Sequence, residues 1–291
     1  MTLGYLLQLV ANGLVLGAFY ALLAMGLSLI FGVLEIVNFA HGEFYMLGAV
    51  GALLAINHFH LDYWTTIASV TLAGAAVGWL LHRVLLGGLA GRSFERSLLL
   101  TLGLGMMLQN GALYVLTATP QIVRTEFGMR SVLLADVRVT WIRLLALAWA
   151  ALGLAGLYLL LYRTRIGQAM RAVAENREAA LVVGIRPERV ARVAVMVGIA
   201  LCGLAGAALA PVYVVTPTMG LTFAFKSFAI VVIGGFGSIG GAAVTAFALG
   251  VVEALVGGTL SLVLADAVAF VAMILVLLFR PLGLFGTGVR V

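Results

Sequence analysis

Long apolar runs recur along the chain and set its class. Most are about as long as the roughly 20 residues that an α-helix needs to cross a bilayer. Inside lipid, such runs form helices or closed barrels, and barrel strands alternate apolar and polar residues. These runs show no such alternation. The sequence therefore predicts an all-α polytopic membrane protein, with spans at 3–31, 64–86, 97–117, 141–162, 189–215, 242–255 and 262–279.

Two further apolar segments are shorter. One runs from Gly42 to about Ile56 and the other from Thr222 to Gly235, and glycines lie at their ends. We expect broken or re-entrant helices here, because irregular backbone at membrane depth is tolerated where it lines a cavity inside the protein. The bundle has nine spans if 222–235 crosses the membrane, with Arg280 in the cytoplasm, and eight if it is re-entrant. Arg280 near the tail favours nine.

Arginine is concentrated in the polar interval 164–187 and its flanks. The stretch 163–192 holds seven arginines, and cytoplasmic loops carry an excess of basic residues. We therefore place this interval in the cytoplasm. The second polar interval, 119–140, then lies outside, and so does the N-terminus if 3–31 and 42–56 both cross.

The two halves of the chain resemble each other. VNFAHGEFYMLGA in the first half is similar to TFAFKSFAIVVIGG in the second, and each follows a long helix rich in glycine and alanine. The alignment superposes His41 on Lys226. Five intervening crossings would invert the second copy. We expect one transmembrane domain, 1–291, made of a first half (1–118), an extracytoplasmic loop (119–140), a linking span (141–163), a cytoplasmic loop (164–187) and a second half (188–291).

Composition agrees with this class and excludes others. Only 10% of the 291 residues are charged, against about 25% in average soluble domains. The net charge of +6 comes from loop arginines, which orient membrane proteins, so we expect a lipid bilayer and no nucleic acid as partner. The single cysteine, Cys202, excludes an internal disulfide. The start, MTLGYLLQLV, lacks a basic region and predicts a retained helix rather than a signal peptide.

The sequence contains no catalytic constellation. Its four histidines have no metal-ligand spacing with cysteine. The glycine-rich stretch GGFGSIGG at 234–241 lacks the lysine and the strand-to-helix context of a phosphate loop. We therefore expect no metal, no cofactor and no ATP binding by this chain itself.

Polar residues inside the apolar segments are candidates for a translocation path. Ionisable groups at membrane depth are costly and face cavities or one another. One interpretation is a path at the repeat interface, where helix ends supply dipoles for a small zwitterion. The other is structural pairing, for example of Glu43 with Lys226. Glu253 and Asp266 are expected at helix ends near water. The candidate path residues are Asn12, Tyr20, Asn38, His41, Glu43 and Lys226.

The interval 164–187 also has helical periodicity. Apolar residues from Ile166 to Val173 share one face, which predicts a short amphipathic helix. Gly184 is placed to end this helix and Pro187 to open the next. A solvated basic loop that only orients the protein is the plain alternative. Small residues such as Ala179 favour docking to a soluble partner.

Four stretches carry a family resemblance. Together they closely resemble the permease subunits of branched-chain amino acid ABC importers, the high-affinity leucine/isoleucine/valine (LivH-type) family. The resemblance covers nearly the whole chain, except that 119–140 shows no recognised motif. The stretches are NGLVLGAFYALLAMGLSLIFGVLEIVNFAHGEFYMLGA, TRIGQAMRAVAENREAALVVGI, KSFAIVVIGGFGSIGGA and RPLGLFG.

The resemblance implies a permease subunit in a bacterial inner membrane that carries branched-chain or related amino acids and is not itself an enzyme. The implied partners are a second related permease, two cytoplasmic ABC ATPases and an extracytoplasmic substrate-binding protein. The segment 167–185 looks like the coupling loop of such permeases. By that similarity, the residues that couple to the ATPase are Gly167, Arg171, Glu175, Asn176, Ala179, Ala180 and Gly184.

A second class of function stays open from the sequence. An ion-coupled secondary amino-acid carrier would explain the repeat, the broken segments and the carboxylates Glu35 and Glu43. It would leave the amphipathic cytoplasmic helix unexplained.

Overall fold

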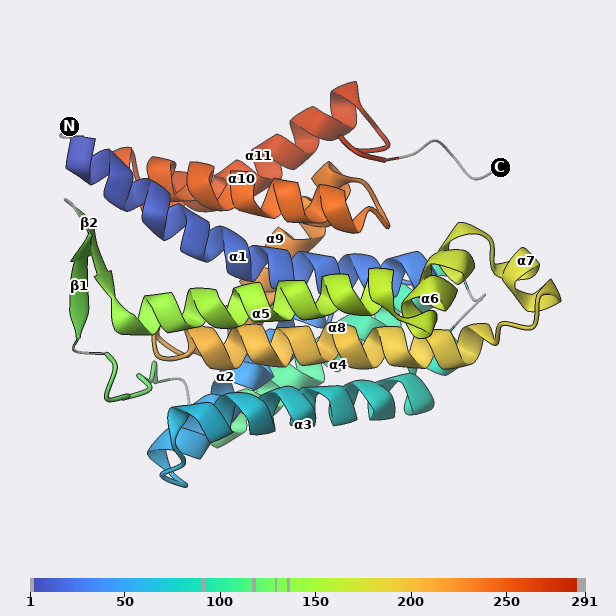
Figure 1. The fold of residues 1–291 in the computed structure, drawn as a ribbon, viewed down its shortest axis with the longest axis horizontal. Helices are drawn as coiled ribbons and strands as arrows, with labels where there is room; N and C mark the ends of the chain where they lie inside the picture. The colour runs from blue at the N-terminus through green and yellow to red at the C-terminus, as the bar shows by residue number, and fades with distance from the viewer. Residues whose placement is uncertain (1–2, 90–92, 117–118, 129, 135–136, 287–291) are drawn as a thin grey trace.

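The chain folds into a bundle of helices that run along one long axis (Figure 1). The computed structural model describes residues 3–89, 93–116, 119–128, 130–134 and 137–286. The elements are α1 (Leu3–Leu34), α2 (His41–Asn57), α3 (Tyr63–Val84), η1 (Leu86–Gly88), α4 (Phe94–Leu116), β1 (Ser131–Leu134), β2 (Val137–Thr140), α5 (Trp141–Arg163), α6 (Arg165–Glu175), α7 (Arg177–Val182), α8 (Pro187–Leu209), α9 (Met219–Gly234), α10 (Ile239–Thr259) and α11 (Leu262–Phe279).

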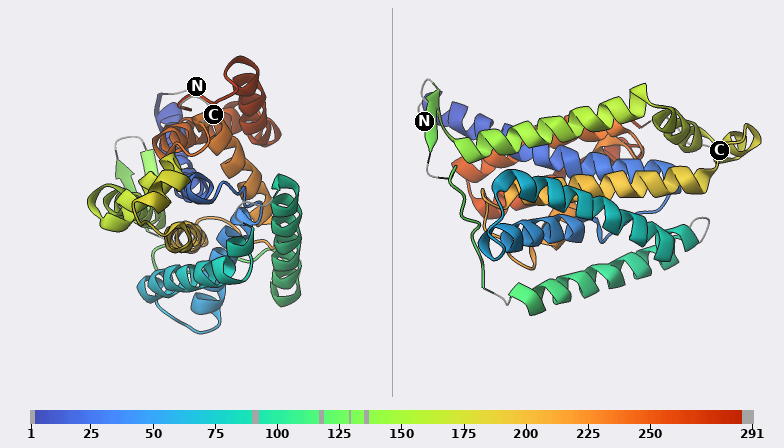
Figure 2. Two further views of the ribbon diagram at one scale, coloured as in Figure 1. Left: turned by 90° about the vertical axis from the view of Figure 1, so that its right-hand side faces the viewer. Right: turned by 60° about the horizontal axis from the view of Figure 1, so that its bottom comes forward.

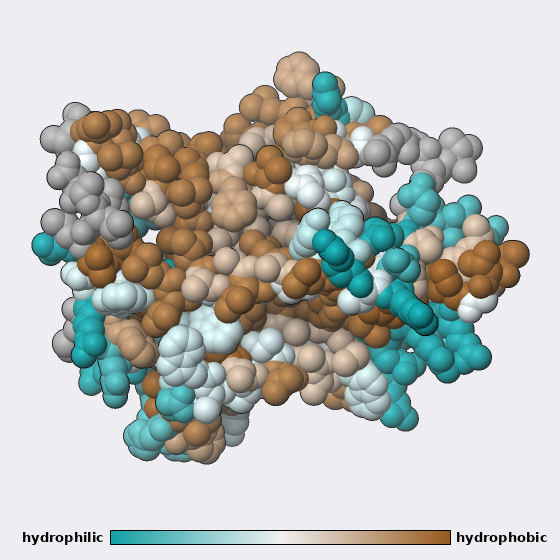
Figure 3. All heavy atoms as spheres, in the orientation of Figure 1, coloured by the Kyte–Doolittle hydropathy of each residue, from teal (hydrophilic) through white to brown (hydrophobic). Residues whose placement is uncertain are grey.

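The predicted class is confirmed. Within the described residues, seven helices are long and apolar enough to cross a membrane, namely α1, α3, α4, α5, α8, α10 and α11, and each matches a long apolar run. The two shorter apolar segments form α2, of 17 residues, and α9, of 16 residues. Polar residues gather at the two ends of the bundle and apolar residues along its middle (Figure 3), as expected for a multi-pass membrane protein.

The sequence did not predict a pair of β-strands. Strands β1 and β2 pair antiparallel from Ser131 opposite Thr140 to Leu134 opposite Val137. An isolated bridge between Gln121 and Val215 ties the same loop to the chain beyond α8. We call this end of the bundle the hairpin end, and the opposite end, which carries α6 and α7, the α6–α7 end (Figure 1).

Helices α1 and α8 form the centre of the bundle. Both are largely buried, and the end-on view places them side by side among the other helices (Figure 2). Helix α1 packs along α10, and α8 packs along α3 and α2. In contrast, α4 packs chiefly against α2, and α11 packs against α9 and α10. The outer helices α4 and α11 therefore expose most of their surface.

Helices from the two halves of the chain pack against each other in pairs. The pair α1–α10 has its counterpart in α8–α3, and α2 crosses α9. At that crossing a Cβ on Gly42 would lie 2.1 Å from the carbonyl oxygen of Gly220, so the two backbones touch. The predicted register is wrong, however. His41 is the first residue of α2, whereas Lys226 lies seven residues after Met219, the first residue of α9.

Backbone conformation sets the breaks around the two short helices. Helix α1 ends where Glu35 adopts a left-handed conformation with φ of 58°. Helix α9 ends at Gly235, whose φ of 97° suits glycine. The N-termini of both short helices lie where α2 and α9 cross, at Gly42 and Gly220.

Candidate functional site

A buried lysine joins four helices. The Nζ atom of Lys226, on α9, lies 2.5 Å from Oε1 of Glu253 on α10 and 2.8 Å from Oδ1 of Asp266 on α11. The hydroxyl of Tyr20, on α1, donates to Oε2 of Glu253 at 2.9 Å. We call these four residues the Lys226 cluster. Because charges at membrane depth are stable only when paired, the cluster fixes α9 between its neighbours.

The Lys226 cluster corrects two predictions. The predicted pair of Glu43 with Lys226 is wrong, since the lysine contacts Glu253 and Asp266. Glu253 was expected near water but is buried, with 9% of its surface exposed. The side chain of Asp266 is 65% exposed. The sequence indicates that Glu253 and Asp266 are unusual, because each interrupts an apolar run. It does not predict that they pair with Lys226, because that residue lies on another helix.

The structure separates His41 from Glu43. The Nε2 atom of His41 lies 3.0 Å from the carbonyl oxygen of Leu23 and 3.1 Å from Sγ of Cys202, so this side chain faces α1 and α8. Two residues later on a helix, about 200° around the axis, Glu43 faces α9 at Gly220 and α4 at Gly105. The polar residues at the start of α2 therefore do not form one site.

Asn38 and Asn12 hold local structure. The Oδ1 atom of Asn38 accepts the N–H of Ala40 at 3.1 Å and shapes the entry into α2. Asn12 lies toward the hairpin end, where its Oδ1 accepts from Nη1 of Arg143 at 2.6 Å and links α1 to α5. Asn12 therefore connects helices and stands apart from the Lys226 cluster.

The predicted coupling segment contains two helices instead of one. Helix α6 stops at Glu175, and the Oδ1 atom of Asn176 accepts the N–H of Ala179 at 2.9 Å to cap α7. Such capping explains the break, because asparagine is among the preferred N-cap residues. Gly184, with φ of 83°, turns the chain after α7, as predicted.

The predicted coupling residues divide into an inner and an outer set. Gly167 and Ala180 are buried, and a Cβ on Gly167 would collide with the end of α5. Arg171 donates to the carbonyl oxygen of Leu161 and lies over the Tyr162 ring. The outer set is exposed and consists of Arg171, Glu175, Asn176, Ala179 and Gly184. The side chains of the outer set are accessible from outside the bundle.

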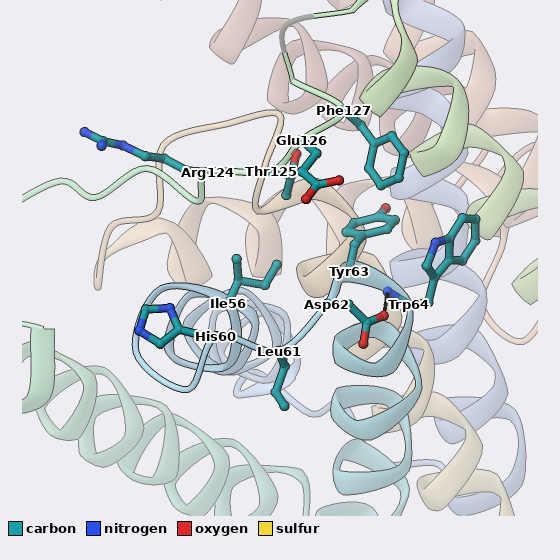
Figure 4. A pocket seen from close by; sticks show the side chains of 10 residues that line it. All are labelled: Ile56, His60, Leu61, Asp62, Tyr63, Trp64, Arg124, Thr125, Glu126 and Phe127. Carbon is teal, nitrogen blue, oxygen red and sulfur yellow. Dashed lines mark hydrogen bonds between the residues drawn. The ribbon is translucent and has the colours of Figure 1, made fainter.

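A cavity of about 430 Å³ opens at the hairpin end (Figure 4). The α2–α3 turn and the segment around Phe127 form its walls, and the rings of Tyr63, Trp64 and Phe127 lie together on one side. Asp62 accepts hydrogen bonds from the hydroxyl and N–H of Thr65, which hold the pKa of this carboxyl below its usual value. Its carboxylate is thus occupied as the cap of α3.

Among the described residues, no group of three or more His, Cys, Asp or Glu side chains is placed to hold a metal ion. The buried ionisable groups on the path candidates belong to the Lys226 cluster and to the start of α2, and buried hydroxyl groups such as those of Ser28, Thr101 and Thr245 lie elsewhere in the bundle.

Comparison with known proteins identifies the family. The family model described as "Branched-chain amino acid transport system / permease component" matches residues 9–277. The chain belongs to this permease family. The permease is 33% identical over 295 residues to BraD of Pseudomonas aeruginosa, a high-affinity branched-chain amino acid transport system permease protein, with 97% of this chain and 96% of BraD covered. The resemblance found in the sequence is thereby confirmed.

Two relatives from Escherichia coli carry the same system name. The permease is 33% identical over 300 residues to LivH, covering 97% of this chain and 96% of LivH. It is 29% identical over 249 residues to LivM, covering 75% of this chain and 57% of LivM. Both are described as permease proteins of a high-affinity branched-chain amino acid transport system. One bacterium thus holds two related permeases of this kind.

Proposed function

We propose that this permease is the membrane-spanning subunit of an ABC importer that carries branched-chain or related amino acids. The functions in the names of the relatives BraD and LivH support the substrate class. The observation that supports coupling to an ATPase is the exposed edge at Glu175 and Ala179, where α6 meets α7. An amphipathic helix at the membrane surface with an exposed end suits docking of a soluble partner. In this proposal the partner hydrolyses ATP, and the permease itself catalyses no reaction.

The path runs, in this proposal, where the two halves of an inverted repeat cross. The paired packing of α1 with α10 and of α8 with α3 supports such a repeat. The inner ends of α2 and α9 meet at Gly42 and Gly220, and helix N-termini favour anionic groups. With the α6–α7 end in the cytoplasm, the hairpin end lies outside, α2 and α9 count among nine spans, and the membrane is the bacterial inner membrane.

The partners follow from the two ends of the bundle. Two cytoplasmic ATPases dock at the α6–α7 end, and an extracytoplasmic binding protein docks at the hairpin end, near the cavity of Figure 4. A second, related permease completes the path in the bilayer, a proposal supported by the paired names LivH and LivM in Escherichia coli. No nucleic acid and no cofactor take part.

Helix α6 lies close to the ends of α1 and α10, so its motion can reach the proposed translocation path. A cavity of about 270 Å³ lies between Met170 and Arg171 of α6, Gly32 near the end of α1, and Ser238, the cap of α10. Displacement of α6 closes or widens this space and moves the ends of α1 and α10 together. ATP-driven closure of the ATPases then rocks the permease between inward and outward forms.

An omission assay tests this assembly. Proteoliposomes with both permeases, both ATPases and the binding protein are compared with samples that lack one component. We expect uptake of radiolabelled leucine only in the complete sample, and no ATP hydrolysis by the permease pair alone. Uptake without the ATPases would contradict the proposal and favour an ion-coupled carrier.

A further inference from the structure

The carboxylate of Glu43 lies on the first turn of α9. A side chain at Gly220 would place its Cβ 2.2 Å from Oε2 and 2.9 Å from Oε1 of Glu43, so the carboxylate fills the space above this glycine. Gly220 is the second residue of α9, in the turn whose backbone N–H groups lack partners within the helix. The N-cap, Thr218, supplies no side-chain cap. A buried acid therefore faces the positive end of a helix.

Glu43 lacks a pairing group among the described residues. Its surface is 3% exposed, and Oε2 has no hydrogen-bond partner there. Lys226, further along α9, is already held by Glu253 and Asp266. A buried carboxylate without a cation is costly, and such groups concentrate at sites of function. Such a carboxylate is suited to bind a cation.

We propose that Glu43 and the first turn of α9 bind the two charges of an α-amino acid. Glu43 accepts the substrate ammonium, and the N–H groups of Gly220 and Leu221 receive its α-carboxylate. This assignment rests on the proposed function as an amino-acid importer. The two charges of the substrate sit on one carbon atom, so their binding groups must be adjacent, and Glu43 and Gly220 are in contact. Charge-assisted bonds of both kinds are strong in a low dielectric.

Aromatic rings lie further along the same two helices and extend the apolar surroundings of the crossing. The ring of Phe223, one turn into α9, lies 4.3 Å from that of Tyr45 and 5.9 Å from that of Tyr20, measured between centroids. On the other side, Gly105 of α4 faces the aliphatic part of Glu43. Because α4 packs chiefly against α2, α4 can move and admit the substrate without disrupting the core. In this proposal the structure represents a closed form of the site.

Protection of an introduced thiol tests the site. Leu221 adjoins Gly220 and is 45% exposed, and Cys202, the sole cysteine, is buried. In the complete transporter carrying Leu221→Cys, the rate of maleimide modification is measured with leucine and with 4-methylpentanoate, which lacks the ammonium. We expect both to slow modification, with leucine effective at a lower concentration.

The variant Glu43→Gln separates the two charges. It should raise the half-protecting concentration of leucine at least about tenfold, the factor that corresponds to about 1.4 kcal/mol, and leave that of 4-methylpentanoate unchanged. The same amide substitution at exposed Glu95, on α4, serves as the control and should change neither value.

Three results would overturn the site while leaving the importer intact. They are wild-type leucine protection in Glu43→Gln, an equal loss of protection by both ligands, and an absence of protection in a sample that imports leucine. The last two mark Glu43 as structural. A complete sample that imports no amino acid overturns the proposed function itself, and the site with it.

Discussion

Lys226 and Glu253 are in contact across two helices, with Nζ 2.5 Å from Oε1, although 27 residues separate them along the chain. Both side chains are buried. Removing one partner of a buried ion pair leaves the other charge buried and unpaired, which destabilises the folded protein by about 3–5 kcal/mol. The contact therefore predicts that replacing one partner destabilises the protein strongly, whereas replacing both partners destabilises it much less.

Replacing Lys226 with Met should destabilise the permease by about 3–5 kcal/mol, because Glu253 keeps its charge in the core. Thermal unfolding in nanodiscs measures the change. The double variant Lys226→Met/Glu253→Gln should recover most of the loss, since no buried charge is then left unpaired. Equal unfolding temperatures for Lys226→Met and wild type would show that the cluster does not hold α9.

Replacing Gly42 with Ala should force α2 and α9 apart. The new Cβ would meet the carbonyl oxygen of Gly220 at 2.1 Å and the nitrogen of Ala224 at 2.4 Å, and neither backbone atom can yield freely. Overpacking of this kind costs about 1–3 kcal/mol. Gly103, on α4, has open space at its Cβ position; there alanine should stabilise by up to about 1 kcal/mol through helix propensity. Equal shifts in unfolding temperature at both sites would contradict the observed crossing.

Reversing the charge of Glu175 should uncouple transport without unfolding the protein. Glu175 is exposed at the break between α6 and α7, and exposed substitutions change stability by about 0.5 kcal/mol or less. We expect leucine uptake by the complete transporter to fall at least about tenfold, a coupling loss of about 1.4 kcal/mol. Glu95→Lys, the same change on α4 at the same end, should leave uptake intact. Undiminished uptake in Glu175→Lys would remove this residue from the docking edge.

The cap at Asp62 should give a pH-dependent contribution to stability. Hydrogen bonds, first of all from the Thr65 hydroxyl, lower the pKa of Asp62 below the unfolded value, which is about 3.9. A lowered pKa means that the stabilisation is present above the unfolded pKa and lost as the pH falls through the folded pKa. Asp62→Ala should therefore unfold at a lower temperature than wild type at pH 7, and the difference should shrink below about pH 4. A difference independent of pH would exclude the carboxylate as its source.

The membrane-spanning helices were predictable because each is a long apolar run, and the short segments that became α2 and α9 were visible for the same reason. The partners of Lys226 were not predictable, since Glu253 and Asp266 reach it only through helix packing. The split of the coupling segment had a local signal in Asn176, a preferred cap residue. The inward position of Ala180 had none, because it depends on how α7 folds back.

The hairpin shows another limit of the sequence. Strands β1 and β2 have four residues each, too few for alternation to stand out against an irregular loop. The separation of His41 from Glu43, in contrast, follows from helical geometry alone, because residues two positions apart point to nearly opposite sides of a helix.

The most direct test of the central claim is the energy source of uptake. Proteoliposomes containing both permeases, the ATPases and the binding protein are supplied with leucine. One sample receives ATP on the side of the membrane that carries the ATPases. The other samples receive no ATP and have only a proton gradient or a sodium gradient across the membrane. The account predicts uptake that requires ATP hydrolysis and is absent with either gradient alone. Uptake driven by a gradient without ATP would contradict it.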